Sequence, residues 1–246
     1  MTDKGLNLFS PGKTPHNNTC FLFFITAVIK SVDENSLLLR CAASGPGNDF
    51  RLGCHEAPPG ILSIYLGDQI YDIIEQIMNN GGATKRKSSD FLDTGVNTIP
   101  QFKKDATDRN RTSPFAFTGD KFEFRMVGSS LSIASVNTIL NAIMADSIRE
   151  MTDEILINKK TVDDVIKETL KAHSRIIFNG NNYSEEWVEE AKKRNLPNSS
   201  CFIESIKALI DPHTIEVMER NGVYSKNELE SVSRNRAMGV AEKILP

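Results

Sequence analysis

The chain has 246 residues, a formal net charge of −3 and a sequence pI near 5.9. Its 39% hydrophobic and 25% charged residues are ordinary for a globular protein, and its length suffices for one large or two small domains. The mild negative charge argues against an indiscriminate nucleic-acid binder, so no nucleic-acid partner is expected.

The four cysteines and four histidines show no spacing typical of a metal site or a disulfide framework. Free thiols in a reducing cytosol are the simplest account of the cysteines. The most apolar run, residues 20–29, is about half as long as the ~20 residues of a membrane span, and no signal-like segment begins the chain. The sequence therefore predicts a cytoplasmic protein with no membrane partner.

The first predicted element in chain order is an amphipathic helix over residues 19–32. Its apolar residues recur at helical spacing and predict one buried face. These residues are Leu22, Ile25, Val28, Ile29 and Val32.

A loop over residues 44–60 follows, rich in glycine and proline. It contains Arg51 and Glu56, and two prolines stiffen the backbone directly after Glu56. A functional loop and a solvated surface loop with one glutamate are both compatible with this pattern. Residues 61–78 are apolar and end at an Asn-Asn-Gly-Gly stop signal, which predicts a strand that leads into a short helix.

The most informative stretch is residues 107–127, which is predicted to form a β-hairpin. Phe115 and Phe117 mark the first strand, and Thr-Gly-Asp at 118–120 supplies the turn. In the second strand, alternation places three apolar residues on the face toward a core and three charged residues on the other face. The apolar residues are Phe122, Phe124 and Met126, and the charged ones are Lys121, Glu123 and Arg125.

The charged face of this hairpin presents Glu123 between Lys121 and Arg125. Arg109 and Arg111, just upstream, add guanidinium groups that suit phosphate or carboxylate oxygens. One carboxylate among several cations is what a metal-bound polyphosphate needs. Alternating charges on a solvated strand face are the alternative.

The rest of the chain is predicted to be helical. A long amphipathic helix over 130–155 carries an apolar stripe that includes Ile133 and Met151. Shorter helices with ordinary capping residues then begin near Thr161, Ser184 and Asp211; a further capping pair is Ser225 with Glu228.

Three segments resemble the glutamine synthetases, in particular their long type III form. The segment RNRTSPFAFTGDKFEFRMVGSS at 109–130 resembles the family's basic run and the strand of form basic–apolar–Glu–apolar–Arg. The segment NDFRLGCHEAPPGILSIYLGDQI at 48–70 resembles the family's arginine segment and flap loop. The segment RIIFNGNNYSEEWVEEAKKRNLPN at 175–198 resembles the helical C-terminal extension of the type III enzymes.

The resemblance implies an α+β fold. Residues 1–157 would be the C-terminal portion of the catalytic domain, with a partial antiparallel sheet and packed helices. Residues 158–246 would be the helical C-terminal extension in truncated form. The family's N-terminal half, which includes the first-metal carboxylates, has no counterpart in these residues.

The resemblance also implies roles on the nucleotide side of an active site. Glu123 corresponds to the ligand of the second divalent metal, Mg²⁺ or Mn²⁺, which bridges the ATP phosphates. Lys121 stands near the nucleotide phosphates, and Arg111 corresponds to the arginine that stabilises the transferred phosphoryl group. A further family arginine, five positions after Arg111, is Ala116 here.

On the substrate side, Arg51 corresponds to an arginine that binds glutamate, and Arg125 to one that holds glutamate and the acyl phosphate. Glu56 corresponds to the flap glutamate that closes the site and helps to deprotonate ammonium. The residue before it is usually Asn in the type III form but is His55 here.

The implied reaction is ATP-dependent conversion of glutamate and ammonia to glutamine through γ-glutamyl phosphate, in a homo-oligomeric ring. Because the first-metal carboxylates are not in this sequence, we expect the 246-residue chain to be inactive by itself. The alternatives are a non-catalytic remnant or regulatory subunit that associates with full-length synthetase, and another ATP-dependent phosphotransferase with the same cationic sheet face.

Overall fold

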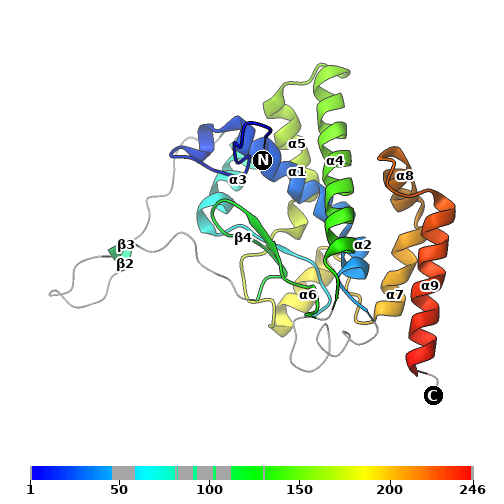
Figure 1. The fold of residues 1–246 in the computed structure, drawn as a ribbon. Coiled ribbons are helices and arrows are strands. Elements are labelled where there is room, and N and C mark those ends of the chain that lie inside the picture. Colours follow the sequence, from blue (N-terminus) through cyan, green and yellow to red (C-terminus); the bar gives the residue numbers. More distant parts are fainter. Residues whose placement is uncertain are drawn as a thin grey trace.

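The computed structural model describes residues 2–45, 59–80, 82, 91–92, 102–103, 112–129 and 131–244. In these residues, helices surround a small sheet (Figure 1). The α-helices are α1 (Thr19–Glu34), α2 (Ser36–Ala42), α3 (Asp68–Asn80), α4 (Ala134–Leu156), α5 (Val162–His173), α6 (Glu185–Lys193), α7 (Phe202–Ile206), α8 (Pro212–Arg220) and α9 (Lys226–Ile244). The 3₁₀ helices are η1 (Pro15–Asn17), η3 (Ser174–Ile176) and η4 (Lys207–Ile210), and the strands are β1 (Ile64–Tyr65), β2 (Phe91–Leu92), β3 (Phe102–Lys103), β4 (Phe115–Phe117) and β5 (Phe122–Phe124).

The predicted hairpin is confirmed as β4 and β5, which pair antiparallel with Ala116 opposite Glu123. Gly119 has φ +98°, a left-handed conformation that favours glycine in this tight turn. On its other edge, β4 pairs with β1 in parallel, with Ile64 opposite Phe115. The α+β class is therefore confirmed. The three-stranded sheet is mixed, with the order β1-β4-β5, and β2 and β3 form a separate antiparallel pair. Within the three-stranded sheet the antiparallel expectation holds for the hairpin only, because β1 reaches β4 through a long connection rather than a turn.

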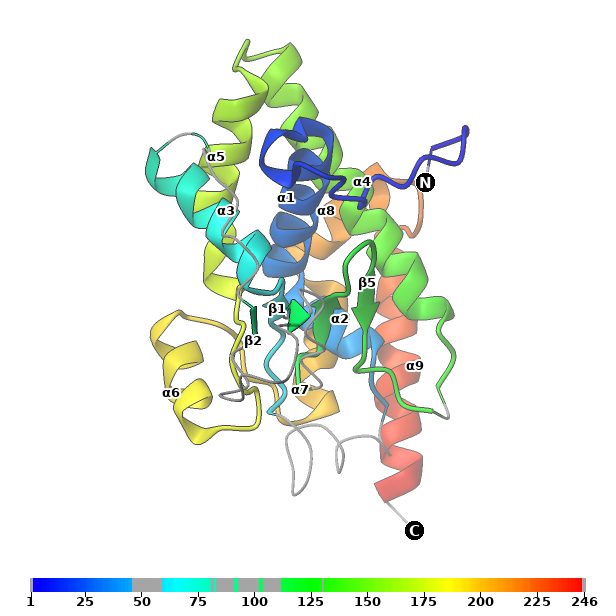
Figure 2. The same cartoon turned by 90° about the vertical axis from the view of Figure 1, so that its left-hand side faces the viewer.

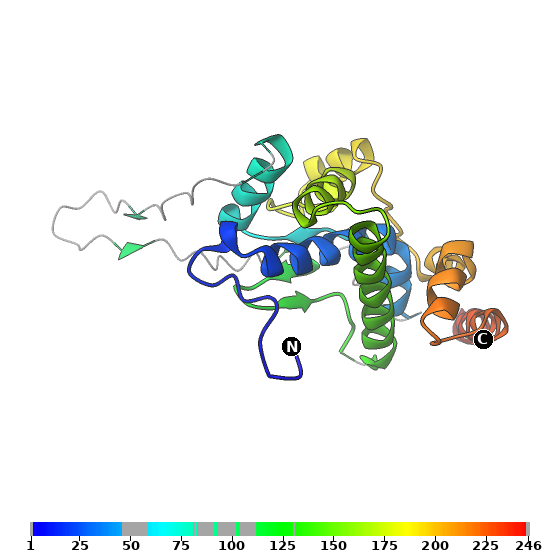
Figure 3. The same cartoon turned by 90° about the horizontal axis from the view of Figure 1, so that it is seen from above.

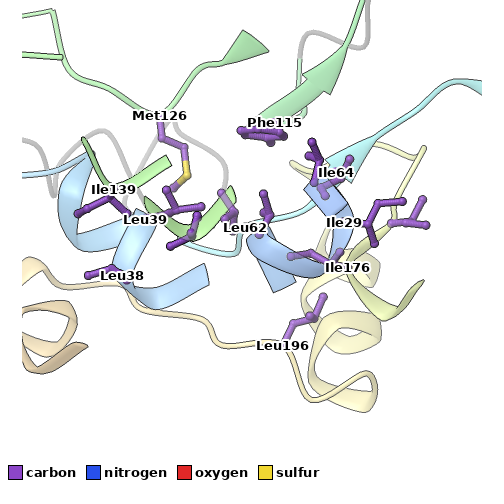
Figure 4. Packing of buried hydrophobic residues seen from close by; sticks show 14 of the residues in the cluster. Ile29, Leu38, Leu39, Leu62, Ile64, Phe115, Met126, Ile139, Ile176 and Leu196 are labelled. Carbon is purple, nitrogen blue, oxygen red and sulfur yellow. The ribbon is translucent and has the colours of Figure 1, made fainter. Parts of the chain in front are cut away.

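The hydrophobic core lies between this sheet and the first two helices (Figure 4). Ile29 of α1, Leu39 of α2 and Ile64 of β1 have no exposed surface. Phe115 of β4 covers them from the sheet side, and Ile176 of η3 closes the core from below in the view of Figure 4. Burial of such large apolar side chains is the main favourable contribution to the stability of this fold.

Helix α1 forms where the apolar periodicity predicted a helix, and α4 and α5 pack against it (Figure 2). Its burial extends beyond the single face that was predicted, since Thr26, Ser31 and Asp33 are buried as well. The α4 stripe is buried at Val136, Ile143 and Met151. Ile133 is an exception, since it precedes the helix and is 63% exposed. The expected stripe therefore begins one turn too early.

Ionic contacts also join these helices. Asp33 of α1 is buried and accepts hydrogen bonds from Arg175 Nε at 2.8 Å and from His173 Nδ1 at 2.9 Å. Lys30 of α1 contacts Glu150 of α4 at 2.9 Å. These contacts fix α1 against α4 and against the end of α5.

The predicted capping residues of the C-terminal third are confirmed, but the helices are not all short, since α9 has 19 residues. The hydroxyls of Thr161 and Ser184 accept N–H donors at the starts of α5 and α6, and Asp211 does the same for α8. Ser225 and Glu228 form a reciprocal pair at the start of α9. Helices α7, α8 and α9 gather on one side of α2 and α4 (Figure 1).

Within the part of the chain that the structure describes, no helix combines the length and the apolar character needed to cross a membrane. The division of the chain at residue 157 stays a prediction.

Candidate functional site

The charged face of β5 is formed as the strand alternation predicted. Arg125 donates to Glu123 Oε2 through Nη2 at 2.9 Å and through Nε at 3.2 Å. Lys121 Nζ lies 4.0 Å from Glu123 Oε1. The three side chains are 66% exposed at Lys121, 42% at Glu123 and 25% at Arg125, so this face is open to a ligand.

The opposite face of the hairpin is held in place by aromatic contacts. Phe122 packs against Phe115 at 5.2 Å between ring centroids and meets Phe9 edge to face at 5.4 Å. The N-terminal segment crosses the hairpin here (Figure 3), where Asn7 Nδ2 donates to the Asp120 carbonyl at 2.7 Å. Side chains on rigid strands are positioned more accurately than side chains on loops, which favours a binding role for this face.

The electrostatics of the site keep Glu123 ionised. The hydrogen bond from Arg125, together with the charges of Arg125 and Lys121, holds the pKa of the Glu123 carboxyl below its usual range. A hydrogen bond from Thr118 contributes in the same direction. Sequence reasoning assigned Thr118 to the turn only. The available signal was its position five residues before Glu123, across a tight hairpin.

A divalent metal ion fits this donor set only together with a polyphosphate. Among the described residues, no group of three or more His, Cys, Asp or Glu side chains could hold a metal ion. Glu123 is a single carboxylate whose Oε2 is engaged by Arg125. Mg²⁺ is commonly bound by one or two carboxylates plus substrate phosphates, and the cations beside Glu123 suit those phosphates.

Three of the predicted site residues, Arg51, Glu56 and Arg111, lie outside the described residues. The structure therefore brings together Lys121, Glu123 and Arg125 and does not test the other three. Thr112, which follows Arg111 directly, is described, as is the strand β4 that follows it.

Ala116 occupies an informative position on β4. It is the cross-strand partner of Glu123 and is 1% exposed. A longer side chain at this position would lie beside the Glu123 carboxylate, because directly opposed residues on one face have neighbouring Cβ atoms. With alanine here, the carboxylate contacts cations from the two residues that flank β5, Lys121 before the strand and Arg125 after it.

The chain is similar to a known protein family and to several curated relatives. A family model described as the glutamine synthetase C-terminal domain matches residues 161–238. The chain is 44% identical over 236 residues to the type-3 glutamine synthetase of Dictyostelium discoideum, an alignment that covers 94% of this chain and 32% of that protein.

Two bacterial relatives are also similar to this chain over almost its whole length. The chain is 39% identical over 244 residues to a glutamine synthetase of Butyrivibrio fibrisolvens, with coverage of 94% of this chain and 33% of the relative. It is 39% identical over 239 residues to that of Bacteroides fragilis (strain YCH46), with coverage of 93% and 32%. The chain thus spans about a third of the length of the curated relatives that it matches.

Proposed function

Because the chain belongs to the glutamine synthetase family, we propose that it supplies one part of a glutamate–ammonia ligase site, namely the strand that meets the ATP phosphates and the substrate glutamate. The observation that carries this proposal is the charged face of β5. There a single ionised carboxylate, Glu123, lies between Arg125 and Lys121 on a strand fixed by aromatic packing.

On the nucleotide side, Lys121 and Glu123 act together. Lys121 neutralises phosphate charge, and Glu123 would hold a Mg²⁺ or Mn²⁺ ion that also takes ATP phosphate oxygens as ligands. When bound, the metal supplies charge neutralisation for phosphoryl transfer. The lowered pKa of Glu123 extends the ionised range of this ligand to more acidic pH.

On the substrate side, Arg125 is 25% exposed and already points its guanidinium at a carboxylate. We assign it to the glutamate and its activated γ-carboxyl group. Arg51, Glu56 and Arg111 complete the proposed site: Arg51 binds glutamate, Glu56 receives a proton from ammonium, and Arg111 neutralises the transferred phosphoryl group.

Within this proposal the chain acts inside a cytoplasmic homo-oligomer, with ATP, glutamate and ammonia as its partners. The relatives' remaining two thirds would supply the other metal ligands, so the chain by itself forms no glutamine. Measurable glutamine formation by the purified chain would contradict this part of the proposal.

A chimera tests the proposed reaction. The matching segment of the Dictyostelium relative is replaced by this chain, and ATP-dependent glutamine formation is measured. The chimera is expected to be active, and Glu123→Gln is expected to lower the rate at least about 100-fold, since a metal ligand and a transition-state charge partner are lost.

The matched control is Glu189→Gln, an exposed glutamate of α6 on a different part of the molecule. It should leave the rate unchanged. An active chimera in which both variants behave alike would refute the role of Glu123. A folded but inactive chimera would favour the reading of this chain as a non-catalytic subunit.

A further inference from the structure

The first residues of the segment 177–182 lie alongside β1 and the residues that follow it. Ile177 forms a parallel bridge with Ile64, and the Phe178 N–H donates to the Ile64 carbonyl at 2.9 Å. A segment from the C-terminal third of the chain therefore covers the strand edge that β1 would otherwise expose.

Two asparagine side chains fasten this segment to β1 and its flanks. Asn179 Oδ1 accepts from the Leu66 N–H at 3.0 Å and from the Gly67 N–H at 3.3 Å. Asn182 is 1% exposed, and its Oδ1 accepts from the Ser63 hydroxyl at 2.6 Å. The bond between Ser63 and Asn182 is buried and therefore costly to break, because breaking it leaves a buried polar group without a partner.

The same segment also reaches the start of β4. The Asn182 N–H donates to Thr112 Oγ1 at 3.0 Å. Thr112 lies three residues before Phe115, where β4 begins, and β4 places Ala116 opposite Glu123. The position of Thr112 thus bears on β4, the strand that pairs with β5 and so supports the candidate site.

The segment is itself anchored on α6 rather than left to move freely. The Phe178 ring stacks on Trp187 with centroids 3.8 Å apart and an interplanar angle of 15°. Arg194 lies over both rings and donates to the Ile177 carbonyl at 2.8 Å. The segment therefore joins a rigid part of the helical region to two strands of the sheet.

We propose that residues 177–182 are a positioning segment for the candidate site, in which Asn182 fixes β1 through Ser63 and fixes the start of β4 through Thr112. This inference rests on the proposed function, because the site that it positions is the charged face of β5. Through it, the helical C-terminal region contributes to substrate binding without touching substrate.

The test compares two substitutions at one position in the full chain. Thr112→Val removes the acceptor oxygen and keeps the shape of the side chain, whereas Thr112→Ser keeps the oxygen. Asn182→Ala removes the second link, to Ser63. Asn181→Ala is the control, because Asn181 is an exposed neighbour whose side chain accepts a local bond from the Tyr183 N–H.

The first readout is amide hydrogen exchange over residues 61–66 and 112–117, which requires no nucleotide. Thr112→Val and Asn182→Ala are expected to speed exchange there about tenfold, the scale of one lost hydrogen bond. Thr112→Ser and Asn181→Ala are expected to match the wild type. Equal exchange in Thr112→Val and Thr112→Ser would overturn the proposal.

The second readout is the affinity for Mg²⁺-ATP, measured at a temperature where every variant is folded. Thr112→Val is expected to bind several-fold more weakly than Thr112→Ser. Faster exchange with an unchanged affinity would overturn the positioning role and leave a purely structural one. If the wild type binds no Mg²⁺-ATP, the proposed function fails, and the exchange data still decide whether the segment holds β1 and β4.

Discussion

Substitutions of Trp187, the one tryptophan of the chain, test how the segment 177–182 is held on α6. It is 1% exposed and stacks on Phe178. Its indole Nε1 is buried and has no hydrogen-bond partner among the described residues. Two substitutions separate these features: Trp187→Ala removes the ring, and Trp187→Phe keeps a ring while removing the unpaired N–H.

The expected magnitudes differ for the two variants. Trp187→Ala should lower the free energy of unfolding by about 3–5 kcal/mol, the range for truncating a large buried aromatic side chain. Trp187→Phe loses some packing, but it also removes a buried N–H group whose lack of a partner costs about 1–3 kcal/mol. The two effects are opposite in sign, so this variant should remain within about 1.5 kcal/mol of the wild type.

Urea unfolding followed by far-ultraviolet circular dichroism measures both variants on one scale. In the wild type, fluorescence of Trp187 reports on the same site, since no other tryptophan contributes. If Trp187→Phe were as destabilised as Trp187→Ala, the stacking account and the cost assigned to the unpaired N–H would both be refuted.

Two further predictions concern buried groups away from the candidate site. Asp33→Asn should lower the free energy of unfolding by about 2–3 kcal/mol, since it weakens charge-assisted bonds from Arg175 and His173 in a buried position; an unchanged urea midpoint would contradict this. Cys20 is exposed, whereas burial raises the pKa of the Cys41 thiol. Iodoacetamide should therefore modify Cys20 well before Cys41 in a mass-spectrometric time course, and equal rates would contradict the buried position of Cys41.

The parts of the fold that were predictable from sequence are those determined by interactions between residues close to one another in the chain. The hairpin followed from Gly119 in the turn and from the alternation up to Met126. Helix starts followed from capping residues such as Thr161 and Ser184, whose hydroxyls accept backbone N–H groups at those positions. In each case, the residues that specify the element lie within a few positions of one another.

The parts that were not predictable depend on contacts between distant residues. The parallel pairing of β1 with β4 and the bridge from Ile64 to Ile177 join segments with no local signal for one another. The hydrogen bonds of Asn182 could not be predicted for the same reason, since its partners Ser63 and Thr112 lie far away in sequence. Periodicity also misplaced the start of α4, because Ile133 continues the apolar pattern although it lies outside the helix and is exposed.

The central claim is that the β5 face binds metal-bound nucleotide through Glu123, and calorimetric titration of the purified chain with Mg²⁺-ATP tests it most directly. We predict saturable binding by the wild type, loss of at least about tenfold in affinity in Glu123→Gln, and wild-type affinity in the Glu189→Gln control. Equal affinity in Glu123→Gln and the wild type, or no binding by a sample shown to be folded, would contradict the claim.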